Sequence, residues 1–101
     1  MIRIRHDQTG DLHRLTVAGH AEYGPHGADI VCAGVSALTY ALLASAEKLG
    51  GDIIGYRADS GDAECVCRGG DGAFTVVLCG MKEIARKYPQ HVEVIDAAQG
   101  G

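Results

Sequence analysis

The chain has 101 residues, a formal net charge of −4, and 47% hydrophobic and 22% charged residues. This composition is typical of a soluble globular protein, and the length predicts one domain, residues 1–101, that buries roughly 65% of its unfolded surface. The acidic balance and the lack of a basic cluster argue against direct nucleic-acid binding, because phosphate contacts need basic side chains.

The sequence carries no signal for export or for a membrane. Its first residues, MIRIRHDQ, lack the apolar core of a signal peptide. The longest uncharged run, 30–46, contains Gly, Ser and Thr and falls short of about 20 apolar residues. We therefore expect a cytoplasmic protein with no membrane span, in which the four cysteines are reduced thiols.

The first half of the chain predicts a hairpin, a loop and a long helix. Residues 2–6 alternate apolar and polar side chains, and 12–18 follow after a Thr-Gly-Asp turn, so both segments are predicted strands. The glycines and the proline of 19–27 predict a loop. Apolar residues at helical spacing predict a helix over 29–50, with Asp29 as its N-cap and a Gly-Gly pair at its end.

The second half predicts the same kinds of element. Strands are expected at 53–58 and 63–68, on either side of a Ser-Gly turn, and a helix at 72–87 is preceded by Asp71 as its cap. A last strand is expected over 91–95. The order strand-strand-helix-strand-strand-helix-strand predicts an α+β fold with two layers, in which two helices cover a largely antiparallel sheet.

Cys32 and His20 are the strongest candidates for catalytic chemistry. Cys32 is expected in the first turn of the helix, where free backbone N–H groups favour the reactive thiolate. On a helical wheel, Cys32, Ser36 and Thr39 fall on one polar stripe that could line a cleft. His20 ends a predicted strand and could act as a general base. The residues alone leave simpler interpretations open: a small buried thiol and an exposed histidine.

Neighbouring residues have roles that the residues alone do not decide. His26 is a rival base that lies nearer to the cysteine in sequence. Asp29 either caps the helix alone, which we favour, or also orients the histidine as the third member of a triad. Gly19, Gly24 and Gly27 would give the loop the freedom to act as a hinged lid.

The remaining cysteines fit no known cofactor or metal motif. Cys65 and Cys67 are two apart on a predicted strand, so both point to one face and are expected to be buried thiols. Cys79 falls on the polar side of the second helix, as an exposed thiol or in a subunit interface. Phosphate-binding glycine loops, nucleophile elbows and zinc motifs are absent from the sequence, and we expect no metal and no cofactor.

The stretch AGHAEYGPHGADIVCAGVSAL, residues 18–38, resembles the signature of the ribosomal-processing cysteine protease family, Prp. In that family a Gly-His-Ala ends a strand, a glycine-containing loop follows, and an Asp-Ile-Val-Cys-Ala-x-Val-Ser begins a helix. Both halves match at the family's spacing. The second half of the chain is similar only in its pattern of strands and helix.

The resemblance implies a cysteine endopeptidase with His20 as base and Cys32 as nucleophile. Asp29 and Ser36 match motif positions with supporting roles, and Gly19 precedes the histidine. The implied substrate is large ribosomal subunit protein twenty-seven, whose short N-terminal extension is removed after a Phe-Phe pair and before Ala. The family also implies a homodimer.

Two other functions remain as alternatives. One is a non-catalytic ribosome-assembly module that binds the same extended peptide by strand addition. The other is a redox sensor that uses Cys32 or Cys79. Replacement of Cys32 by Ala would end the activity of a peptidase but would leave a binding module working. A redox sensor would cleave no peptide.

Overall fold

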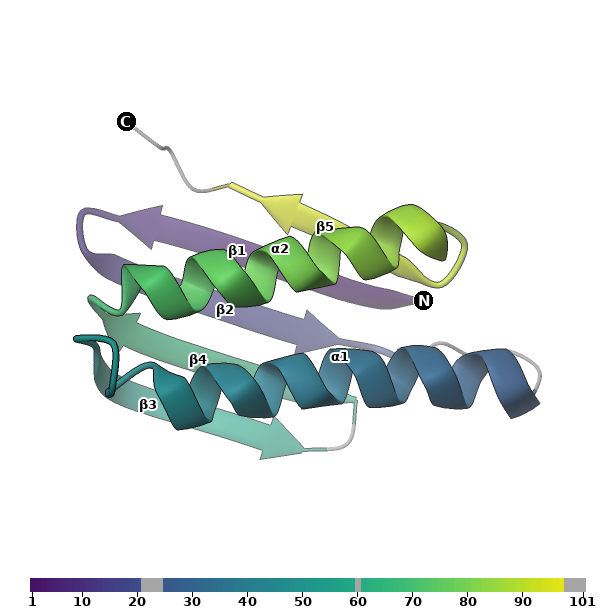
Figure 1. Ribbon diagram of the computed structural model, residues 1–101, viewed down its shortest axis with the longest axis horizontal. Coiled ribbons are helices and arrows are strands. Elements are labelled where there is room, and N and C mark those ends of the chain that lie inside the picture. Colours follow the sequence, from purple (N-terminus) through teal and green to yellow (C-terminus); the bar gives the residue numbers. More distant parts are fainter. Residues whose placement is uncertain (21–24, 60, 98–101) are drawn as a thin grey trace.

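The computed structural model describes residues 1–20, 25–59 and 61–97, with residues 25–29 described by their secondary structure alone. In these residues five strands form one sheet, and two helices lie side by side across one of its faces (Figure 1). The predicted two-layer α+β architecture and its element order are confirmed. In chain order the elements are β1 (Ile2–Thr9), β2 (Leu12–Ala18), α1 (Pro25–Ser45), β3 (Asp52–Asp59), β4 (Asp62–Arg68), α2 (Asp71–Lys87) and β5 (Val92–Asp96).

The sheet is antiparallel except at one pairing. Its strand order is β3-β4-β2-β1-β5, and the β1–β2, β2–β4 and β3–β4 pairs are antiparallel. The last strand pairs in parallel with the first, with Ile2 opposite Val92. As a result β1, the first strand of the chain, lies inside the sheet, and β3 and β5 form its two edges.

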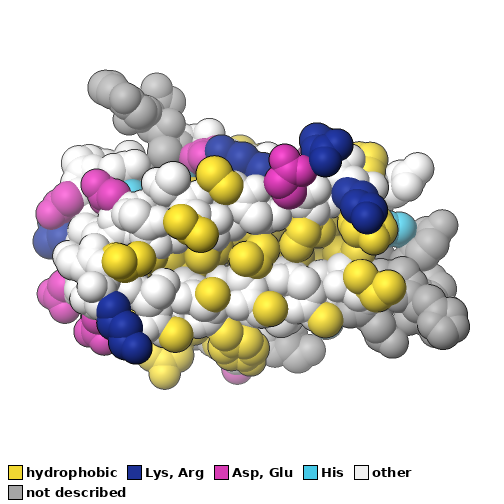
Figure 2. Space-filling model, viewed as in Figure 1, with side chains coloured by type: hydrophobic (Ala, Val, Ile, Leu, Met, Phe, Trp, Pro, Cys, Tyr) yellow, Lys and Arg dark blue, Asp and Glu magenta, His cyan; other side chains and the backbone are white. Residues whose placement is uncertain are grey.

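The core lies between the sheet and the helices. Alternation along β1 buries Ile2 and Ile4 and leaves Arg3 and Arg5 in solvent, as a strand with one covered face requires. Figure 2 shows hydrophobic side chains gathered in the groove between the two helices. The helices contribute these buried side chains: Val31, Val35, Leu42, Ala73, Phe74, Val77, Leu78 and Met81. Ala46, in the turn after α1, is buried with them. Among the described residues no helix is both long and apolar enough for a bilayer crossing.

The start of α1 differs from the prediction. The helix begins at Pro25, so the predicted loop over 25–27 is wrong and Gly27 is helical, whereas Gly24 lies outside the described residues. Proline is favoured at a first helical position because its missing N–H and fixed φ cost nothing there. Asp29 is the fifth residue of the helix and cannot be its N-cap. Cys32 is the eighth and lies two turns into the helix, not in its first turn.

The predicted end of α1 and the predicted start of α2 also shift. Regular helix stops at Ser45, and a turn through 46–50 leads to Gly51, whose N–H donates to the Ala46 carbonyl at 2.8 Å. The N-cap of α2 is Gly70, in the left-handed region at φ 74°, and not Asp71. Asp71 is the first residue of the helix, and its carboxylate contacts a buried histidine instead.

That contact belongs to a chain of four side chains at one end of the sheet. Asp96 Oδ1 lies 2.9 Å from His6 Nδ1, His6 Nε2 lies 2.9 Å from His13 Nδ1, and His13 Nε2 lies 2.6 Å from Asp71 Oδ1. Both imidazoles are almost fully buried and stack on Phe74, with the His13 and Phe74 ring centroids 4.2 Å apart. The chain joins β5, β1, β2 and the first turn of α2.

A lysine lies beside this histidine chain. The Lys82 ammonium donates to Asp96 Oδ2 at 2.8 Å, so α2 contacts the chain through Lys82 as well as through Asp71.

Candidate active site

A cavity of about 340 Å³ opens where three elements meet. The end of β2, the middle of α1 and the β3–β4 turn surround it, and Ile2 of β1 also lines it. His20, Cys32 and Ser36 all line this cavity, although the histidine and the cysteine come from different elements. Its other lining residues are Val17, Gly19, Val35, Thr39, Tyr40, Ala58, Asp59, Gly61, Asp62 and Ala63.

The polar stripe predicted on the helix faces the cavity. Cys32 is partly buried and packs against the core, and Ser36 lies one turn further along and is exposed. Thr39 is buried, and its hydroxyl donates to the Val35 carbonyl at 2.8 Å. All three side chains line the cavity, so the helical-wheel prediction of a cleft beside the core stripe is confirmed.

The helix start does not activate Cys32 as predicted. The favourable field of a helix N-terminus is confined to the first turn, and Cys32 is the eighth residue of α1. Cys32 therefore lies beyond the reach of this field, and any activation of its thiol falls to a neighbouring base. Among the described residues lining the cavity, His20 supplies the imidazole.

Gly19 fixes the backbone that leads into His20. Its φ of 96° lies in the left-handed region, as the hinge prediction requires of a glycine. Its N–H donates to the Gly61 carbonyl at 3.0 Å, and a Cβ on Gly19 would overlap the Met1 carbonyl oxygen. The residue before the histidine is therefore held by β1 on one side and by the β3–β4 turn on the other.

Sequence reasoning missed the acidic side of the cavity. Asp59 and Asp62 line it from the β3–β4 turn. Arg57 binds Asp62 at 3.0 Å, and this hydrogen bond holds the pKa of the Asp62 carboxyl below its usual range. No local motif marks these residues, because the pairing of β2 with β4 brings them beside His20.

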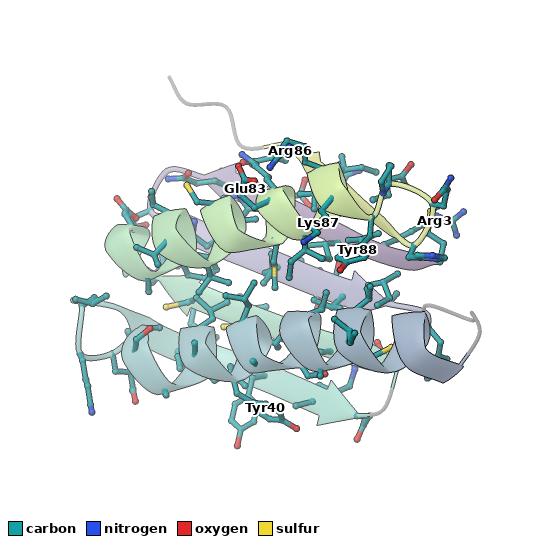
Figure 3. The ribbon with its side chains drawn as sticks, turned by 45° about the vertical axis from the view of Figure 1, so that its right-hand side comes forward. Arg3, Tyr40, Glu83, Arg86, Lys87 and Tyr88 are labelled. Atoms are coloured by element: carbon teal, nitrogen blue, oxygen red, sulfur yellow. The ribbon has the colours of Figure 1, made fainter. Side chains whose placement is uncertain are left out.

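Tyr40 was also missed, although the sequence held a signal for it. It follows Cys32 and Ser36 at intervals of four residues, which places all three on one face of α1. The side chain is 61% exposed and projects from α1 on the side away from α2 (Figure 3). Glu83 and Arg86, by contrast, lie on the outer side of α2, 2.8 Å apart.

The remaining predicted residues either lie away from this cavity or have side chains outside the described part of the structure. The side chains of His26 and Asp29 fall outside the described residues, so their roles stay predictions. Cys65 and Cys67 are buried, as predicted, and Cys79 is exposed on α2. Among the described residues, no three His, Cys, Asp or Glu side chains are arranged so that they could hold a metal ion.

Comparisons with known proteins give a consistent result. The sequence model of the family described as cysteine protease Prp matches residues 1–93. No curated protein matches the sequence.

Solved structures share the fold. The ribosomal processing protease Prp from S. aureus, in complex with a covalently linked product peptide, superposes with a TM-score of 0.79 at 20% identity, over 95% of this chain and 99% of that one. The same protease with a substrate peptide gives 0.75 at 21% identity, over the same shares. SMU.848 from Streptococcus mutans gives 0.74 at 23% identity, over 98% of this chain and 96% of that chain.

Proposed function

Because this chain belongs to the cysteine protease Prp family, we propose that it is a ribosomal-processing endopeptidase that uses Cys32 as nucleophile and His20 as base. Family membership makes it a cysteine protease, which favours the peptidase over the binding module and the redox sensor. The observation that carries the assignment is that His20 and Cys32 line one cavity from two different elements.

The proposed reaction has two stages. His20 accepts the Cys32 proton, and the thiolate sulfur attacks the scissile carbonyl carbon. The C–N bond then breaks, the leaving amine takes the proton from His20, and the acyl group stays on the sulfur as a thioester. His20 next accepts a proton from water, whose oxygen attacks the thioester. The C–S bond breaks, and the sulfur takes back the proton.

The cavity lining supports a substrate with large apolar side chains. Val17, Val35 and Tyr40 offer apolar surface beside the cysteine, and the volume of about 340 Å³ lies within the range of ligand pockets. The S. aureus relative was solved with a substrate peptide. We propose that this chain removes the extension of large ribosomal subunit protein twenty-seven, with cleavage after Phe-Phe and before Ala.

Ser36 has a proposed supporting role. It lies one helical turn beyond Cys32, is exposed, and lines the same cavity. Its hydroxyl can donate to or accept from the backbone of an extended peptide in that cavity. Ser36→Ala should therefore weaken peptide binding more than it slows the chemical step, which a KM increase at constant kcat would reveal.

The setting of the enzyme is part of the proposal. The net charge of −4 and the pairing of exposed arginines with carboxylates support a protein that works in the cytoplasm without binding nucleic acid directly. We propose a homodimer. Light scattering on the purified chain should give twice the monomer mass of 10.5 kDa, and the monomer mass would refute it.

Cleavage of a synthetic peptide that contains Phe-Phe-Ala tests the assignment. Cys32→Ala should abolish cleavage, and His20→Ala should slow it by roughly 10²–10⁴-fold, the usual contribution of a general base. Cys79→Ala, which removes an exposed thiol elsewhere, is the matched control and should keep the full rate. Retention of activity in Cys32→Ala would refute the assignment.

A further inference from the structure

The His20 imidazole lies directly against a glycine of the β3–β4 turn. A Cβ added to Gly61 would overlap Nε2 of the ring, and it would lie 2.7 Å from Cε1 and 3.2 Å from Cδ2. Atoms of a side chain essentially never approach so closely, so the ring occupies the space that any other residue at position 61 would fill. No other described glycine meets a side chain of the proposed catalytic pair in this way.

The backbone of Gly61 also holds the residue that precedes His20. Its carbonyl accepts the Gly19 N–H at 3.0 Å, one position beyond the last β2–β4 pair, Ala18 opposite Asp62. Gly61 itself has φ 74°, a conformation that side-chain-bearing residues rarely adopt. One residue thus anchors the chain before His20 and lies against its ring.

From this double contact we propose that Gly61 is a positioning residue of the active site, which sets the direction of the His20 imidazole toward Cys32. The inference rests on the proposed role of His20 as base. The β3–β4 turn then belongs to the active site, because it restricts the position of the His20 ring. A side chain at position 61 would push the ring aside and separate base from nucleophile, while peptide could still enter the cavity.

The chain supplies a matched control. Gly10, in the β1–β2 turn, has a φ of 61°, and a Cβ placed there meets no atom within 4 Å. Gly61→Ala and Gly10→Ala therefore force an L-residue into similar backbone conformations, and only Gly61→Ala displaces His20. We expect similar losses in Tm for the two variants. Gly61→Ala should lower kcat by roughly a hundredfold with little change in KM, and Gly10→Ala should keep kcat within about twofold.

A second pair of variants covers the case in which Gly61→Ala fails to fold. Asparagine tolerates the left-handed region better than alanine and still carries a Cβ. Gly61→Asn should lose kcat as Gly61→Ala does, and Gly10→Asn should not. Unchanged kcat in a folded Gly61 variant, beside a large loss in His20→Ala, would overturn the positioning role.

A readout without turnover separates this proposal from the proposed function. In NMR spectra the Gly61 α-protons should be shifted by the ring current of His20, and His20→Ala should remove the shift. Limited alkylation should show a slower Cys32 reaction in Gly61→Ala, with the Cys79 rate unchanged. If His20→Ala cleaves normally, the catalytic assignment fails even where the ring-current shift is present. If the shift is absent from the wild type, the contact and the positioning role fail.

Discussion

Cys65 and Cys67, which are separated by one residue on β4, have different surroundings from the proposed nucleophile, Cys32. Cys65 is buried in the sheet opposite Leu15 and Tyr56. Burial, with a smaller contribution from Cys67, raises the pKa of the Cys65 thiol to about 11. Because the thiolate is the reactive form, Cys65 is inert at neutral pH.

Cys65 therefore predicts a labelling pattern. Iodoacetamide at pH 7.5 should leave Cys65 unmodified in the folded protein and modify it fully in denaturant, as mass spectrometry of tryptic peptides would show. The exposed Cys79 is the internal control and should react in both. Modification of Cys65 as fast as Cys79 in the folded state would contradict the burial.

The raised pKa of Cys65 also predicts how stability depends on pH. Folding favours the protonated thiol, so the contribution is complete below the pKa of the unfolded chain, about 9, and is lost as pH rises toward about 11. The free energy of unfolding should fall by on the order of 2 kcal/mol over this interval. Urea titrations of wild type and Cys65→Ala at several pH values measure the difference between their free energies of unfolding. This difference should shrink as the pH rises.

At the scale of elements, two glycines let the helices pack closely. A Cβ on Gly80 of α2 would lie 3.0 Å from both methyl carbons of Leu38 of α1, and one on Gly34 would lie 3.2 Å from Cδ1 of Ile84. A Cβ at either position would make a tighter contact than most side chains allow, so the facing Leu38 or Ile84 side chain would have to move slightly.

Two glycine replacements in α2 should consequently differ in their effect on stability. At Gly72 a Cβ meets nothing within 4 Å, so Gly72→Ala should stabilise the protein by up to about 1 kcal/mol through helix propensity. Gly80→Ala gains the same propensity but crowds Leu38, and it should be less stable than Gly72→Ala by about 1–3 kcal/mol. Thermal unfolding of the two variants compares them, and equal gains would refute the close contact.

The elements also show which parts of the fold and of the site could be predicted from the sequence. Period-two alternation predicts β1, and the Thr-Gly-Asp turn after it predicts β2. The Gly-His-Ala and Asp-Ile-Val-Cys segments point to His20 and Cys32, and each of these signals is local. The start of α1 differs from the prediction because Pro25 and Gly27 are residue types typical of loops, although proline is also a good first helical residue. Gly61 carried no signal, since its role depends on which strands pair.

At the scale of the whole molecule, the two polar sites occupy opposite ends of the sheet. The active-site cavity lies where β2 ends, and the histidine chain lies where β1 ends and β2 begins. His6 joins β1 to β5 through Asp96, and His13 joins β2 to α2 through Asp71, so these histidines link elements that are distant in sequence. The histidine chain is therefore expected to support the fold and to take no part in cleavage.

Replacement of one imidazole tests that separation. His13→Leu removes the partner of His6 Nε2 and of Asp71 Oδ1, and it should cost about 2–3 kcal/mol of unfolding free energy. At a temperature where the variant is folded, kcat should stay unchanged. Asp11→Asn, which breaks an exposed ion pair with Arg68, is the control and should cost less than about 1 kcal/mol.

The parallel pairing of β5 with β1 has a consequence for the chain as it is synthesised. A ribosome releases β1 before β5, so the outer edge of β1 stays unpaired until residues 92–96 emerge. An open strand edge with apolar side chains, here Ile2 and Ile4, invites aggregation with other chains. Arg3 and Arg5 alternate with them on the opposite face, and charged residues on a strand edge oppose pairing with a second strand. In the folded enzyme these arginines pair with Glu93 and Asp7 on the surface, and in the nascent chain we expect the same two charges to limit aggregation.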